Sequence, residues 1–251
     1  MITSRPPRAV RGRPGSRPAD GYDAAVADLV QLAGRLVAVP LGALARGRRG
    51  RPMHPRGAVF DAVLERTGST PPWGVPWLDA ADRAAVVVRM SRGAGLPAPL
   101  PDLLGLAIRL PGDAGPIDLL LTSAGRGAVT RLVPVPRRDS AAVYSSIMGY
   151  RSDAGVVRFA AVPDGHGVPS QPGPLAGVVA RAGLRFTLAA ARGAGPWRPF
   201  ARLVLTSPTD PLDCDVRFDA VSNPPPGLVP DGPAARFRAP AYARARAESR
   251  R

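Results

Sequence analysis

Short apolar runs separated by glycine, proline and aspartate dominate the chain after residue 57. They are rich in Val, Leu, Ile and Phe, which is typical of β-strands. Val216, Phe218 and Ala220 alternate with polar residues, which predicts a strand with one solvent-exposed face. A continuous run such as that at 85–88 predicts a strand covered on both faces. We predict eight strands, over residues 58–65, 84–91, 104–110, 117–123, 156–162, 184–191, 200–206 and 214–220.

Two helices are predicted at the ends of this strand-rich region. Residues 21–36 repeat Leu and Ala near helical spacing, and Asp20 is a suitable N-cap. Residues 240–250 predict a short terminal helix with Pro240 in its first turn. Strands and helices do not alternate along the chain, so a parallel βαβ sheet is disfavoured. The predicted fold class is therefore α+β, a mostly antiparallel β-barrel with flanking helices.

The basic character of the chain changes this picture only in part. Residues 1–20 hold five arginines among proline and glycine, so we expect a disordered basic arm. Residues 21–251 fit one domain on length. The formal net charge is +15 and every basic residue is arginine, which by itself points to nucleic acid or an anionic membrane surface. Aromatic residues are only 5%, too few for stacking bases, so we keep this binding function as an alternative.

Several classes of protein are excluded by composition. A single cysteine, Cys214, excludes a disulfide scaffold and a Cys-rich metal site. No segment is apolar enough over a bilayer's length, and the N-terminus lacks the apolar region of a secretory signal, so a cytoplasmic location is the simplest expectation. The acidic residues of segment 210–215 could bind a divalent ion. No histidine accompanies them, and we interpret them as a solvated strand and turn.

The two histidines differ in their surroundings. His166 lies between glycines and is interpreted as a loop tip. His54 lies where a basic loop, residues 46–57, meets the first predicted strand. A loop residue held at the end of a rigid strand is well placed for chemistry.

Five segments in order along the chain resemble the haem-binding core of the catalase superfamily, in its short, helix-poor form. Arg51-Pro-Met-His54-Pro-Arg-Gly57 resembles the R-x-x-H-x-K/R-G segment with the distal histidine. Val87-Val88-Arg89-Met90-Ser91 resembles V-R-F-S, DLLGLAIRL at 102–110 resembles D-x-x-G-x-A-x-K/R, and IDLLLTS at 117–123 resembles W-D-L-V-G-N-N. The end of the chain, from FDAVSNPPPG onward, resembles the F-D-P…R-x-x-x-Y-A-x-S…R-R tail of small catalase-related peroxidases. The resemblance covers residues 35–251.

The resemblance implies a haem b cofactor with a protein ligand on its proximal side. Tyr242 matches the tyrosine that binds the haem iron as a phenolate. A free tyrosine has a pKa of about 10, so the anion needs stabilisation. Arg238 lies four residues earlier, and a nearby guanidinium favours the phenolate.

On the distal side, the resemblance implies an acid–base histidine and two propionate-binding arginines. His54 would move the proton of a bound peroxide, and Ser91 would hydrogen-bond to His54 and fix its tautomer. Arg51 and Arg89 would face the haem propionates, because a forked guanidinium suits a carboxylate.

One departure from the family pattern affects the expected activity. The family's distal asparagine falls at Thr122, which is shorter and lacks an amide donor. A peroxidase acting on hydrogen peroxide or organic hydroperoxides is therefore favoured over strong catalase turnover. Two alternatives stay open: a haem-free, degenerate barrel that binds an anionic ligand, and a basic nucleic-acid or membrane-surface binder. The electron donor and the oligomeric state are open as well.

Overall fold

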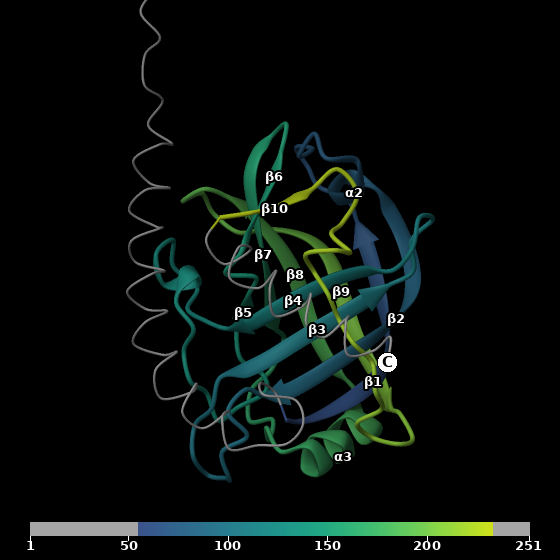
Figure 1. Ribbon diagram of the computed structural model, residues 1–251, viewed down its shortest axis with the longest axis vertical. Helices are drawn as coiled ribbons and strands as arrows, with labels where there is room; N and C mark the ends of the chain where they lie inside the picture. Colours follow the sequence, from purple (N-terminus) through teal and green to yellow (C-terminus); the bar gives the residue numbers. More distant parts are fainter. Residues whose placement is uncertain (1–54, 233–251) are drawn as a thin grey trace, which may run out of the picture.

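A closed antiparallel barrel of eight strands is built from residues 55–232, the part of the chain that the computed structural model describes (Figure 1). Strands β1, β2, β3, β4, β5, β7, β8 and β9 follow one another around the wall, and β9 pairs with β1 to close it. β6 pairs with β7, and β10 pairs with β6. The strands are β1 (Arg56–Thr67), β2 (Ala81–Arg92), β3 (Leu104–Leu110), β4 (Ile117–Ser123), β5 (Tyr144–Ser145), β6 (Gly149–Ser152), β7 (Gly155–Pro163), β8 (Leu184–Arg192), β9 (Arg198–Pro208) and β10 (Val229–Asp231).

The barrel interior is filled by side chains. Alternate residues of each strand point inward, and they form one apolar cluster with aromatic rings at its centre. The ring of Phe159 lies 5.2 Å from that of Tyr150, 5.9 Å from that of Phe200 and 5.9 Å from that of Trp77. Such spacings are typical of packed aromatic cores. The interior is therefore the hydrophobic core, and the functional surface has to be sought outside it.

Two short helices seal the barrel. α2 (Pro76–Asp79) carries Trp77 and Leu78 into the core, and its Asp79 carboxylate accepts hydrogen bonds from three backbone N–H groups of the preceding turn. α3 (Pro172–Ala182) packs against β9 and β1 through Leu175 and Val179. Both helices begin at proline, which suits the first helical turn. A single turn of 3₁₀ helix, η1 (Thr130–Leu132), follows β4.

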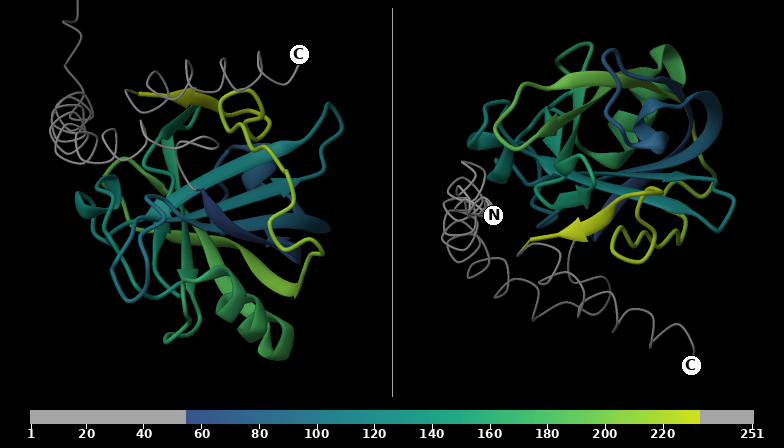
Figure 2. Two further views of the ribbon diagram at one scale, coloured as in Figure 1. Left: turned by 60° about the horizontal axis from the view of Figure 1, so that its bottom comes forward. Right: turned by 90° about the horizontal axis from the view of Figure 1, so that it is seen from above.

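The prediction of a strand at 214–220 is wrong, although the other seven predicted strands are confirmed. Residues 209–223, called the strap below, run outside β1–β4, with turns at 212–213 and 220–222 and no strand ladder among residues 214–220 (Figures 1 and 2). Val216 and Phe218 are less exposed than Asp215 and Arg217. The alternation therefore comes from an extended chain lying on a surface. In the barrel, the two-residue strand β5 takes the place of the eighth predicted strand.

Some predicted elements lie outside the described residues. These are the arm at 1–20, the helix at 21–36 and the helix at 240–250. Within residues 55–232, no helix combines the length and apolar character needed to cross a membrane.

Candidate functional site on the outer face of strands β1–β4

The outer face of β1–β4 collects residues from the sequence motifs. Leu104, Leu106 and Ile108 belong to the core, so Gly105, Ala107 and Arg109 face outward. By the same alternation the outer face receives residues from the three neighbouring strands. They are Gly57 and Val59 from β1, Val87, Arg89 and Ser91 from β2, and Asp118, Leu120 and Thr122 from β4.

An ion pair between Arg89 and Asp213 lies against Gly57 and so links two of the motifs. Asp213, in the strap, accepts hydrogen bonds from Arg89 Nε at 2.8 Å and from Arg89 Nη2 at 3.0 Å. The same carboxylate accepts the backbone N–H of Gly57 at 3.1 Å. A Cβ at position 57 would lie 2.6 Å from the Arg89 guanidinium. Glycine lets the guanidinium lie against the backbone, and any larger residue would push the Arg89 side chain away from this position.

Asp118 joins the other two strand motifs to the strap. It is fully buried, and Arg109 donates to it through Nε and Nη2, both at 2.8 Å. The Asp219 backbone N–H and the Asn223 side-chain amide also donate to Asp118, each at 2.8 Å. This hydrogen bonding to Asp118 raises the pKa of Arg109 above its ordinary value. Four donors on one buried carboxylate make Asp118 the anchor of the strap.

The strap is tied to each of the four strands. Its Leu212 carbonyl accepts the Val59 N–H of β1 at 2.7 Å, and Asp213 holds Arg89 of β2. The Arg217 carbonyl accepts from Arg109 of β3, whose guanidinium also lies 5.1 Å from the centre of the Phe218 ring. These contacts hold the strap across the outer face. Ser91 and Thr122 lie on the same face, to one side of the strap.

Ser91, Gly105 and Thr122 lie side by side across three strands. In the register of the sheet Gly105 pairs with Ser91 on one side and with Thr122 on the other. Gly57 pairs with Ser91 from β1. Next to Gly105 on the same face is Ala107, so the middle of this surface bears no side chain larger than a methyl group. We call Ser91, Gly105, Ala107, Leu120 and Thr122 the shelf: a mostly apolar surface with a hydroxyl group at two of its corners.

The loop after β2 is fixed by a buried carboxylate beside the shelf. Asp102 accepts the N–H groups of Ala94 at 2.9 Å, Leu96 at 3.0 Å and Leu103 at 2.8 Å. Arg92 lies 3.7 Å from Asp102 and donates to the carbonyls of Leu96 and Leu100. These bonds hold the end of β2 just beyond Ser91.

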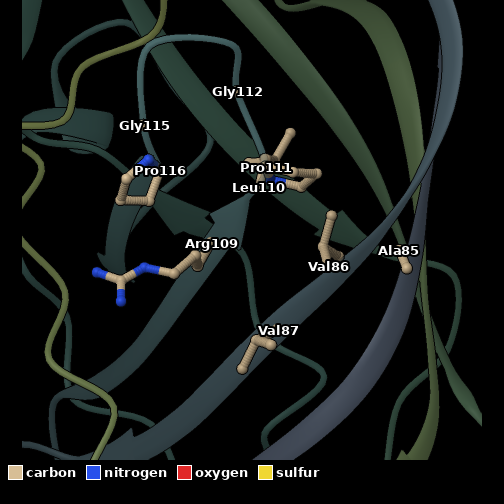
Figure 3. A pocket seen from close by; sticks show the side chains of 9 residues that line it. All are labelled: Ala85, Val86, Val87, Arg109, Leu110, Pro111, Gly112, Gly115 and Pro116. Atoms are coloured by element: carbon tan, nitrogen blue, oxygen red, sulfur yellow. The ribbon is translucent and has the colours of Figure 1, made fainter.

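An open hollow lies on the same face, at the far end of β2 and β3 (Figure 3). Its volume is about 410 Å³. Val87 and Arg109 line it together with the Pro111–Pro116 turn, and Arg109 is its only charged side chain. Because Val87 and Ser91 are four residues apart on one strand, their Cα atoms are separated by roughly 13 Å. The hollow and the shelf are therefore neighbouring surfaces of one face.

The structure brings together two of the six site residues predicted from sequence. Ser91 lies on the shelf and Arg89 at its edge, where Asp213 holds the guanidinium. Arg51, His54, Arg238 and Tyr242 lie outside the described residues. Sequence reasoning missed the roles of Asp213 and Asp118.

The 210–215 acids, considered as an ion-binding cluster, are separated by their partners. Asp213 pairs with Arg89, and Asp215 lies 3.5 Å from the Arg217 side chain. Among residues 55–232, no three His, Cys, Asp or Glu side chains gather as a potential metal site. The local sequence around Asp213 gives no indication that its partner is Arg89, 124 positions earlier in the chain.

Solved structures that resemble this chain are catalases. Catalase A from Saccharomyces cerevisiae aligns with a TM-score of 0.59 and 12% sequence identity over 82% of this chain and 62% of that one. A bacterial catalase gives 0.56 and 11% identity over 76% and 56%, and a fungal catalase gives 0.53 and 15% over 78% and 58%. The chain thus spans less than two thirds of each. No protein-family model and no curated protein matches the sequence. The likeness shows a catalase-like fold.

Proposed function

We propose that this chain is a catalase-related haem peroxidase that acts on hydrogen peroxide or organic hydroperoxides at the outer face of β1–β4. The observation that carries the proposal is the way four family-like segments interlock. Gly57 of the first segment packs against Arg89 of the second, and Arg109 of the third pairs with Asp118 of the fourth. The strap ties both pairs together. The named neighbours are catalases, which supports a peroxide as substrate.

The small and apolar residues of the shelf support a haem as its ligand. A planar macrocycle needs a flat apolar surface, and Gly105 and Ala107 leave the centre of the shelf without bulky side chains. Leu120 adds apolar surface on β4. Arg89 lies at the edge, where a carboxylate is already bound to its guanidinium. The shelf therefore suits the ring, and a propionate at Arg89 would have to share the guanidinium with Asp213.

Bound haem would supply the redox chemistry by which the peroxide O–O bond is broken. The chain would supply proton transfer: His54 takes the proton from the inner peroxide oxygen and returns it to the leaving oxygen. His54 precedes Gly57 by three positions, which span at most about 11 Å, and Gly57 pairs directly with Ser91. This short link to Ser91 supports the role proposed for it, a hydrogen bond to His54 that holds the tautomer of the imidazole.

On the other side of the cofactor, Tyr242 would be the iron ligand and Arg238 would favour its phenolate form. Thr122 stands at the corner of the shelf where the family pattern has asparagine. Its hydroxyl can hydrogen-bond to a peroxide but reaches less far than an amide. This geometry favours peroxidase turnover with a donor over rapid dismutation of hydrogen peroxide.

The test is peroxide turnover of haem-loaded protein carrying His54→Ala. General acid–base catalysis contributes about 10²- to 10⁴-fold, so we expect a loss of at least a hundredfold. His166→Ala is the matched control, because His166 is the other histidine of the chain and is exposed. Equal turnover in wild type and His54→Ala would overturn the assignment of His54.

The distribution of charge favours a second candidate function, binding to an anionic surface through the chain ends. Residues 55–232 hold 18 arginines and 15 acidic residues, a net charge of +3. The remaining +12 of the +15 belongs to residues 1–54 and 233–251. We propose that residues 1–17 and 236–251 bind nucleic acid or anionic lipid. Affinity for DNA should then fall steeply with salt, and deletion of residues 1–17 without effect on binding would count against the proposal.

A further inference from the structure

We propose that a small pocket beyond the end of β2 binds a phosphate group, either free or carried on a small organic molecule. The pocket has a volume of about 160 Å³. Its polar side chains come from Arg92, Arg138, Ser170 and Gln171, and its apolar wall is the segment 98–100. None of these residues belongs to the shelf, so the inference goes beyond the proposed function and does not depend on haem.

Two buried side chains bring hydrogen-bond donors to the pocket. Arg92 is 2% exposed, and three of its five N–H groups donate to the Leu96 carbonyl at 3.0 Å, the Leu100 carbonyl at 2.7 Å and the Ser170 hydroxyl. Within residues 55–232 the other two N–H groups, one on each terminal nitrogen, have no partner. Ser170 is 6% exposed, and its hydroxyl still has a proton to donate, for which the same residues offer no acceptor. Because buried donors are costly when unpaired, a ligand that accepts from them is stabilised.

The pocket has two arginines in its lining and no carboxylate. Asp102 lies 3.7 Å from Arg92 Nε, and its oxygens accept three backbone N–H groups of the loop after β2. Asp139 follows Arg138 in the chain, but its carboxylate likewise accepts three backbone N–H groups. Among the side chains that the structure describes, no carboxylate pairs with the exposed Arg138 guanidinium. The positive charge of Arg138 is therefore available to an anion in the pocket.

This set of donors suits a phosphate group better than a carboxylate. A carboxylate has two oxygens, whereas a phosphate monoester has three terminal oxygens and a charge of about −1.5 to −2 at pH 7. Arg92, Arg138 and Ser170 provide donors for all three oxygens. The 11-residue helix α3 begins directly after Gln171 with no acidic residue in its first turn and no side-chain cap, so its positive end adds to the attraction. The organic part of a phosphate ester can lie against the segment 98–100.

The test is isothermal titration calorimetry of the full-length protein with inorganic phosphate and with phenyl phosphate, at constant ionic strength. For Arg138→Gln we expect the affinity for both anions to fall about tenfold, the factor expected from one charge-assisted hydrogen bond. Arg137→Gln is the matched control, because Arg137 is also exposed and adjacent in the chain but does not line the pocket. Since salt screens a charge outside the pocket, this control should change either affinity by less than about twofold.

Leu100→Ala distinguishes the two sources of the phosphate group. The Leu100 side chain is 48% exposed, and the substitution keeps the backbone carbonyl that Arg92 uses. A loss of affinity for phenyl phosphate alone assigns the pocket to a phosphate ester, and unchanged affinity for both anions assigns it to free phosphate. Wild-type protein that binds neither anion, or equal losses for Arg138→Gln and Arg137→Gln, would overturn the inference. Tighter binding of benzoate than of phenyl phosphate would overturn the choice of phosphate over carboxylate.

Discussion

Replacement of Asp118 by asparagine should release the strap from the barrel. Asp118 accepts four hydrogen bonds at 2.8 Å, two of them from Arg109. Asparagine keeps one acceptor oxygen and places an N–H₂ donor against other donors. Three of the four bonds are accepted by Oδ2 and one by Oδ1, so the amide nitrogen removes at least one of them, and the Arg109 guanidinium loses its counter-charge.

The expected magnitude follows from the burial of the pair. Removing one partner of a buried ion pair costs about 3–5 kcal/mol. The Arg109 side chain is 28% exposed and can turn partly toward water, so we expect the lower end, about 3 kcal/mol. For a domain of this size this corresponds to a fall in Tm of roughly 6–12 °C.

The assay is urea unfolding of wild type and Asp118→Asn, with the free energy of unfolding extrapolated to water. Asp113→Asn is the control, because Asp113 is exposed in the turn between the same two strands. It should change stability by less than about 0.5 kcal/mol. Hydrogen exchange should speed up in residues 213–223 for Asp118→Asn only. A loss below about 1 kcal/mol would refute the reasoning that Asp118 anchors the strap.

Three further predictions concern other residues of the barrel wall. Gly57→Ala places a Cβ 2.6 Å from the Arg89 guanidinium and should destabilise the barrel by about 1–3 kcal/mol in urea unfolding, whereas Gly165→Ala, which meets nothing within 4 Å, should be neutral. Thr122→Asn, measured by oxygen evolution from haem-loaded protein, should raise hydrogen peroxide dismutation severalfold because it adds the missing amide donor; an unchanged rate would contradict that role. The hydrogen bond from Arg66 lowers the pKa of Asp82 below its ordinary value of 3.8, so its stabilisation is present above that value and is lost as pH falls through the lower folded-state pKa. The stability difference between wild type and Asp82→Asn should be small, since Asp82 is half exposed, and should shrink as the pH falls below 3.8; a difference that does not shrink in acid would be inconsistent with this pair.

The strands of the barrel wall could be predicted because their pattern is local. Val86, Val88 and Met90 of β2 belong to the core and alternate with outward-facing residues. The strap shows the limit of that signal. Residues 214–220 alternate as well, but exposure alternates in any extended chain that lies on a surface, and only backbone pairing separates a strand from such a segment. β5 has two residues, too few to show a period.

Of the site, the sequence predicts only those residues that belong to the family-like motifs. Ser91 and Arg89 were identified by resemblance to a family, and the sheet places them on the outer face next to Gly105 and Gly57. The partner of Arg89 could not be predicted, because Asp213 lies 124 positions away in the chain and no local pattern links the two. Asp213 was interpreted as a solvated acid for the same reason. Contacts of this range are set by topology, which becomes visible only once the strap is placed across the strands.

Haem binding is tested most directly by an absorbance spectrum. The protein is purified from cells supplied with a haem precursor, and the measurement is repeated for Tyr242→Phe. We predict a Soret band in wild type that shifts or disappears in the variant, because the phenolate ligand of the iron is lost. A colourless wild-type protein that also fails to take up added haem would contradict the account.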